Sequence, residues 1–238
     1  MTIVALKGFR DLRAIEEGAA ALEEERPDSC PGGCQYRMWK HTGYRRTAID
    51  ESGKRWKVFV PRFRCGQCGQ TISCLFDVLI PYVRFTIQAV VAHVETYLMR
   101  ETTYEEMAWS EDNEKGPSKS TMFRWVNRLA ERAEKLASTV QREAVLIDPG
   151  NADMEPVESN CPNSSKARID GKAGMLDRGA ECIGLAERFL VYRPFEEDSI
   201  LTVLHRYCMT AAETVWSILS GRVGLSVSSQ QRVKYVIF

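Results

Sequence analysis

Four of the eight cysteines stand in two short pairs whose spacing suits a metal ion. Cys30 and Cys34 enclose Pro-Gly-Gly, Cys65 and Cys68 enclose Gly-Gln, and 30 residues separate the pairs. Thiolates are soft ligands, and two short Cys loops can supply the tetrahedral four-sulfur set of a structural zinc site. Neighbouring glycines let backbone N–H groups turn toward the sulfurs. The pattern predicts one structural Zn²⁺ ion and leaves no open position for catalysis.

The remaining candidate ligands are less specific. Cys74, Cys161, Cys182 and Cys208 each stand alone in or beside apolar sequence, which is typical of buried thiols. Ordinary buried thiols would not explain the spacing of the two pairs. His41 is an alternative ligand, but it lies on the approach to a predicted strand and not in a Cys loop.

The segment between the pairs must bring them together, and it has the pattern of a β-hairpin. Residues 44–49 and 56–60 are strand-like, and Asp-Glu-Ser-Gly at 50–53 forms a turn signal between them. Residues 30–72 carry nine Lys and Arg against two Asp and Glu, a net charge of +7. We therefore expect a basic zinc ribbon that contacts phosphate. The candidate contact residues are Arg45, Arg46, Arg62 and Arg64.

Helical patterns follow the predicted ribbon. Apolar residues recur at helical spacing over residues 87–98, and residues 103–106 have the form of a capping box. Ser118 can cap a third helix whose apolar stripe continues to Leu136. Three helices with a turn before the last one are in the order of a helix-turn-helix, whose last helix enters the major groove of DNA.

The third predicted helix carries side chains that suit DNA. Arginine can pair with guanine, asparagine with adenine, and hydroxyl groups and lysine with phosphate. Residues 115–142 have a net charge of +5, and the acidic residues 95–114 help to bring the formal net charge of the chain to zero. A solvated basic helix face is the alternative interpretation. The candidate contact residues are Lys119, Ser120, Thr121, Arg124, Asn127 and Arg128.

Together these patterns predict an α+β protein, with a β zinc ribbon followed by a helical module and a mostly helical C-terminal region. No apolar run reaches the roughly 18 residues of a membrane span, and no secretory signal is evident, so we expect a cytoplasmic protein that is nucleoid-associated when bound to DNA. The expected parts are an acidic helical extension (1–27), the zinc ribbon (28–80), the helix-turn-helix module (81–142), a linker or long loop (143–180) and the C-terminal region (181–238).

Both modules together resemble a family of bacterial zinc-ribbon proteins related to insertion-sequence transposases. The resemblance covers roughly residues 28–140, and it implies a transposon-associated, DNA-binding protein with an accessory or regulatory role or a truncated transposase remnant. Its implied partners are DNA and a transposase or a second copy of the chain. The motifs that carry it are the first Cys pair, HTGYRR at 41–46, VPRFRCGQCGQTIS at 60–73, LIPYVRFT at 79–86 and SKSTMFRWV at 118–126.

Two other functions stay open at the level of sequence. An active transposase would need carboxylates that hold two divalent metal ions, and Asp148 is the only one placed as at a strand end. Asp153 and Glu155 follow it too closely to be separate strand-borne partners. The lack of a complete carboxylate set favours a protein that is not an enzyme. The second alternative is a protein-interaction scaffold built on the zinc ribbon.

Overall fold

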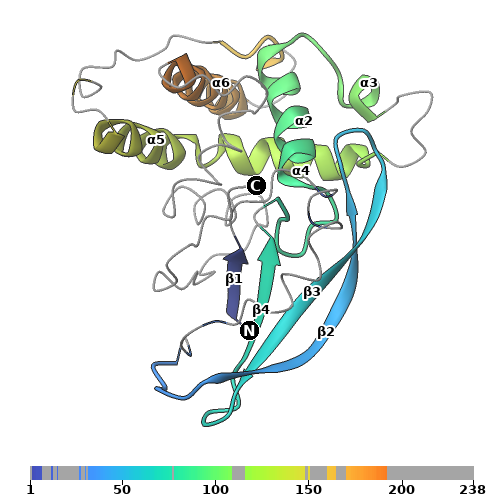
Figure 1. Ribbon diagram of the computed structural model, residues 1–238. Helices are drawn as coiled ribbons and strands as arrows, with labels where there is room; N and C mark the ends of the chain where they lie inside the picture. Colours follow the sequence, from blue (N-terminus) through green and yellow to red (C-terminus); the bar gives the residue numbers. More distant parts are fainter. Residues whose placement is uncertain are drawn as a thin grey trace. The chain divides into compact units, whose positions relative to one another are not determined.

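The chain folds into two compact units that divide between Thr86 and Ile87. The first unit contains a β-sheet and the second contains helices (Figure 1), so the predicted α+β class is confirmed. The computed structural model describes residues 2–6, 12, 15, 27, 30, 32–76, 78–108, 116–147, 150, 160–164 and 170–191.

The sheet of the first unit has the strand order β1-β4-β3-β2 among the described residues. Strands β2 (Met38–Ile49), β3 (Arg55–Cys65) and β4 (Thr71–Phe76) pair in antiparallel fashion. Strand β1 (Thr2–Leu6) lies parallel to β4. The sequence predicts a helical extension over residues 1–27; its first described segment is a strand, whereas the described residues Leu12 and Ile15 are helical. Pairing with the distant β4 decides the conformation of this segment.

The β2–β3 hairpin is longer than the sequence pattern predicted. Its register runs from the Met38–Cys65 pair to the Ile49–Arg55 pair, with an irregularity between His41 and Tyr44. Gly43 lies at this irregularity, where an added Cβ would stand 2.1 Å from the Phe59 ring, so only glycine fits. Two buried residues near its base, Met38 and Phe63, explain why the strands extend as far as the cysteines.

Five helices are described in the second unit, and the first three begin near a signal in the sequence. Helix α2 (Ile87–Met99) confirms the first helical pattern, and α3 (Tyr104–Ala108) begins at the predicted capping box. The Thr103 N–H donates to Glu106 Oε2 at 2.7 Å, and the Glu106 N–H donates to Thr103 Oγ1 at 3.1 Å. Helices α4 (Lys119–Ala130), α5 (Ala133–Ile147) and α6 (Asp170–Val191) follow.

The third predicted helix is in fact two helices. The apolar stripe from Met122 to Leu136 is buried as expected. Its backbone breaks at Glu131 and Arg132, so α4 and α5 are separate elements. Helix α6 packs against α2, α4 and α5 and completes the core of this unit.

Part of the segment predicted to be a linker is buried structure. Helix α6 begins at Asp170, inside the expected linker at 143–180. The fully buried Asn163 donates from Nδ2 to the carbonyl oxygens of Tyr97 and Arg100, at 2.7 and 2.8 Å. These bonds satisfy backbone oxygens at the C-terminus of α2, which would otherwise lack partners. Asn163 thus lies in a turn whose buried side chain connects this segment to α2.

Three predicted elements of the C-terminal region cannot be compared with the structure. The helices predicted near residues 200–207 and 210–219, and the strand predicted at 233–238, lie outside the described residues. Among the helices that are described, none is both long enough and apolar enough to span a membrane.

Candidate metal centre and basic surfaces

The β2–β3 hairpin brings the two cysteine pairs together. The Met38–Cys65 pair closes one end of the ladder, with Cys30 and Cys34 just before β2 and Cys68 just after β3. The 30 residues between the pairs thus run out along one strand and back along the other. This antiparallel return is the physical reason that two pairs distant in sequence meet in space.

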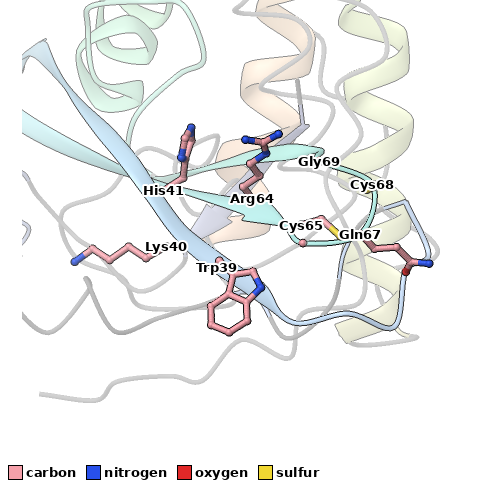
Figure 2. Close-up of a pocket in the computed structure, with 9 residues that line it drawn as sticks. Trp39, Lys40, His41, Arg64, Cys65, Gln67, Cys68 and Gly69 are labelled. Atoms are coloured by element: carbon pink, nitrogen blue, oxygen red, sulfur yellow. The ribbon is translucent and has the colours of Figure 1, made fainter.

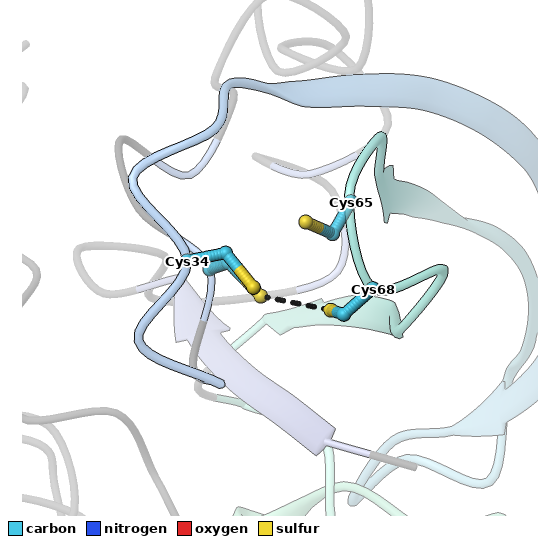
Figure 3. Close-up of side chains that lie close together, drawn as sticks. Cys34, Cys65 and Cys68 are labelled. Carbon is cyan, nitrogen blue, oxygen red and sulfur yellow. Dashed lines mark hydrogen bonds between the residues drawn. The ribbon is translucent and has the colours of Figure 1, made fainter.

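The four thiols form a compact cluster at this end of the hairpin. The sulfur atoms of Cys30, Cys34, Cys65 and Cys68 all lie within 4.8 Å of one another. Figure 3 shows Cys34, Cys65 and Cys68 converging from two loops, and Cys30 Sγ lies 3.6 Å from Cys68 Sγ. Four sulfurs bound to one zinc ion at about 2.3 Å would lie about 3.8 Å apart. The cluster therefore matches the dimensions of a four-thiolate metal site, and it could hold one metal ion.

Two glycines make the turns of the Cys loops. Gly33 and Gly69 have φ values of +76° and +72°, in the left-handed region that favours glycine. The Gly33 N–H donates to the Cys30 carbonyl at 2.9 Å, and the Gly69 N–H donates to the Cys65 carbonyl at 3.1 Å. The turns differ, since the hydrogen bond spans three residues from Cys30 to Gly33 and four residues from Cys65 to Gly69, but both loops bring their cysteine side chains toward one point.

The electrostatic environment differs between the thiols. The backbone N–H groups of Cys68 and Gln67 lower the pKa of Cys65 to about 7. The nearby Cys68 thiol, followed by burial, raises the pKa of Cys34 to about 12, and burial also raises the pKa of Cys30. Donors aimed at Cys65 favour its thiolate, which is the form that binds a metal ion.

The other predicted candidates are not part of this cluster. Of the described residues, the His, Cys, Asp and Glu side chains close enough to share an ion are the four paired cysteines, without His41. Cys74, Cys161 and Cys182 are buried separately, while Cys208 and the candidate carboxylates Asp148, Asp153 and Glu155 lie outside the described residues.

The arginines predicted to contact DNA from the sheet unit fall into two groups. Arg45 and Arg64 are exposed, and Arg62 is half-buried. Arg46 is half-buried and donates from Nη2 to the carbonyl oxygens of Ile80 and Val83, at 3.2 Å to Ile80. Burial lowers its pKa. Arg46 therefore attaches the segment after β4 to strand β2, a role that its sequence context did not indicate.

Helix α4 presents the predicted polar face. Met122, Trp125 and Leu129 are buried, whereas Lys119, Ser120 and Arg124 on other faces are exposed. Ser118 caps the helix by accepting a hydrogen bond from the Thr121 N–H at 3.3 Å. The remaining predicted contact residues, which are less exposed, are Thr121, Asn127 and Arg128.

Several of these side chains already have partners within the unit. Lys119 Nζ forms an ion pair with Glu105 of α3. Asn127 Nδ2 donates to the Phe123 carbonyl at 2.6 Å. Arg124 Nε likewise donates to the Ser120 carbonyl at 3.0 Å. These contacts fix the side-chain conformations on the polar face of α4. The ion pair also offsets the charge of Lys119.

A hollow that the sequence did not predict lies beside the cysteine cluster. Figure 2 shows the Trp39, His41 and Arg64 side chains around it, next to the loop from Cys65 to Gly69. Trp39 is 58% exposed, which is unusual for an indole that no partner chain covers. The signal in the sequence is a tryptophan directly followed by Lys40 in a basic segment.

Comparison with known families adds one finding. Residues 30–125 match the family model of a domain of unknown function, DUF6431. The matched segment begins at the first cysteine of the cluster and ends within α4, so it spans the metal-site candidate, helices α2 and α3 and the first part of α4. No curated protein and no solved structure matches the chain.

Proposed function

We propose that the protein is a zinc-dependent DNA-binding protein, with a zinc ribbon at residues 28–80 and a helix-turn-helix at residues 81–142. The observation that carries the DNA part of the proposal is the face of α4, where Lys119, Ser120 and Arg124 are exposed opposite a fully buried apolar stripe. A helix of this kind can enter the major groove with its N-terminal turns first.

The convergence of four thiols supports the zinc part. A set of four sulfurs with no oxygen or histidine ligand favours zinc over magnesium or calcium, which prefer oxygen. Such a closed set stabilises a fold and leaves no open position for a substrate. Zinc would therefore hold the Cys loops on the basic hairpin.

A transposon-associated role is the more specific form of this proposal. It is supported by the order of motifs, from the Cys pairs through LIPYVRFT at 79–86 to SKSTMFRWV at 118–126. In this role the chain would act as an accessory or regulatory protein at the ends of an insertion sequence, together with a transposase or a second copy of itself.

The test is a DNA-binding titration of the zinc-loaded full chain over a range of salt concentrations. Because lysines and arginines release counterions from phosphates, we expect the affinity to fall steeply as salt rises. Arg124→Ala should weaken binding to the preferred duplex between about fivefold and about 150-fold. Gel shift or fluorescence anisotropy measures both effects.

Lys135→Ala is the matched control for charge. Lys135 is exposed on the neighbouring helix α5, so its loss changes the net charge by one without touching α4. An equal loss of affinity in both variants would show only a nonspecific charge effect, and it would contradict the assignment of α4. Absence of duplex binding by the zinc-loaded chain would overturn the proposal.

A further inference from the structure

The hollow beside the cysteine cluster joins an aromatic face to positive charge. Its nine described lining residues include Trp39, Lys40 and Arg64, and none of the nine is acidic. In the β2–β3 register Trp39 stands directly opposite Arg64. Directly opposed residues of an antiparallel pair lie on the same face of the sheet, so Trp39 and Arg64 belong to one face of the hairpin.

The side chains of Trp39 and Arg64 both contact the second Cys loop. A Cβ added at Gly66 would lie 3.0 Å from Trp39 Nε1, and one added at Gly69 would lie 3.5 Å from Arg64 Nη2. The edge of the indole therefore rests against backbone at Gly66, and the arginine rests against Gly69. Because both glycines belong to the loop that carries Cys65 and Cys68, the hollow is built on the candidate metal site.

We propose that this hollow binds single-stranded DNA by stacking an unpaired base on Trp39 while Arg64 contacts an adjoining phosphate. Exposed aromatic rings beside positive charge are the features by which proteins hold single strands, since every base offers a flat face. An acidic peptide would satisfy the charges but would leave the indole exposed. A duplex offers phosphates, but its bases are already stacked on one another.

This inference rests on the proposed DNA-binding function and deepens it. A protein that binds duplex DNA through α4 and a single strand through the sheet unit could bind a junction between paired and unpaired DNA. The two contacts involve different units of the chain, so they can be tested separately.

The test compares oligothymidylate, which does not pair with itself, with a duplex of equal length. Both are titrated into the zinc-loaded full chain and followed by fluorescence anisotropy. Trp39→Ala should weaken binding of oligothymidylate between about fivefold and about 150-fold and leave duplex binding unchanged. Trp39→Phe should retain most of the affinity, because it keeps an aromatic face.

Tyr44→Ala is the matched control, because Tyr44 is a partly exposed aromatic residue of the same strand that does not line the hollow. Zinc content is measured for every variant, so that a loss of fold is recognised. Gly66→Val provides a second test. The valine side chain would displace the Trp39 indole from its contact with Gly66, so this variant should weaken oligothymidylate binding as Trp39→Ala does.

The results separate the two proposals. Duplex binding without oligothymidylate binding would overturn this inference and leave the proposed function standing. Oligothymidylate binding that depends on Trp39, without duplex binding, would uphold the hollow and overturn the role of α4. Equal losses for Trp39→Ala and Tyr44→Ala would also overturn the assignment to the hollow.

Discussion

At the scale of single residues, Asp50 shows how one side chain can fix the hairpin that supports the cysteine cluster. Its Oδ1 accepts hydrogen bonds from the Ser52 N–H, the Ser52 hydroxyl and the Lys54 N–H, at 3.0, 2.6 and 2.9 Å. Its Oδ2 accepts from Trp56 Nε1 at 2.7 Å. Burial alone would raise the pKa of Asp50, but these donors outweigh burial and the pKa is lowered.

Replacement of Asp50 by alanine should therefore destabilise the hairpin. We expect Asp50→Ala to lower the free energy of unfolding by about 1 kcal/mol at neutral pH, the usual size for hydrogen bonds near solvent. Because the folded-state pKa is lowered, the contribution of the carboxylate is complete above its ordinary pKa of 3.8 and is lost as pH falls below it. Urea unfolding at several pH values measures the difference between variant and parent.

Glu51→Ala is the control for this prediction, because Glu51 is exposed in the same turn. It should leave the stability nearly unchanged. A difference between Asp50→Ala and the parent that grew as the pH fell below 3.8 would contradict the assigned role.

The ligand residues are the part of the site that sequence predicts best, because the spacing within each Cys pair is local. The turn at Asp50 is local as well. The inward direction of Arg46 could not be foreseen, since arginines are mostly exposed and its two acceptors lie more than thirty residues away. The hollow at Trp39 depends on strand register, which no local pattern contains.

At the scale of elements, a helix can be predicted where the sequence shows an apolar stripe or a capping residue. A helix or strand that forms mainly through packing against distant residues cannot be predicted in this way. Helix α2 has a regular apolar stripe, and α3 and α4 have hydrogen-bonded caps. Strand β4 has buried residues on both faces, so it lacks the alternation that identifies a strand, and the sequence pattern does not predict it. Helix α6 contains four glycines, which suggested a loop.

The glycines of α6 give a prediction for this element. A Cβ at Gly179 would meet the Leu98 and Ala130 side chains at 3.3 and 3.4 Å, so α6 approaches its neighbours closely there. We expect Gly179→Leu to lower the free energy of unfolding of the helical unit by about 1–3 kcal/mol through overpacking. Thermal unfolding followed by circular dichroism at the helix band measures the change.

Gly174 serves as the matched control on the same helix. It is exposed, and an added Cβ would approach only Arg178 Nη1, at 3.8 Å. Gly174→Ala should therefore stabilise the unit by about 0.5–1 kcal/mol, because alanine has the higher helix propensity. Similar destabilisation by both substitutions would show that α6 does not pack as described.

At the scale of the whole molecule, the division at Thr86 places the candidate metal site and the five helices α2 to α6 in different units. The two units have separate buried cores, so loss of metal should affect one of them directly. Three of the four thiols are buried or half-buried, and without an ion they would be polar groups with few partners.

Removal of the metal is thus expected to unfold the sheet unit and to spare the helices. A strong chelator should release one zinc ion per chain and abolish the near-ultraviolet signal of the sheet-unit aromatics, with little loss of helix signal. Cys68→Ser should have the same effect, and Cys182→Ser, at a buried cysteine outside the cluster, should keep the ion. Metal analysis under native conditions and circular dichroism provide the measurements; full zinc retention by Cys68→Ser would contradict the assigned ligand set.

Strand β2 lies at the edge of the described sheet, and one consequence concerns solubility at high concentration. An edge of twelve residues could pair with the same edge of a second molecule. The irregularity at Gly43 interrupts the ladder, and the exposed Lys40 and Arg45 repel a like-charged neighbour. The residues that make this edge basic therefore also keep copies of the chain from joining into continuous sheets.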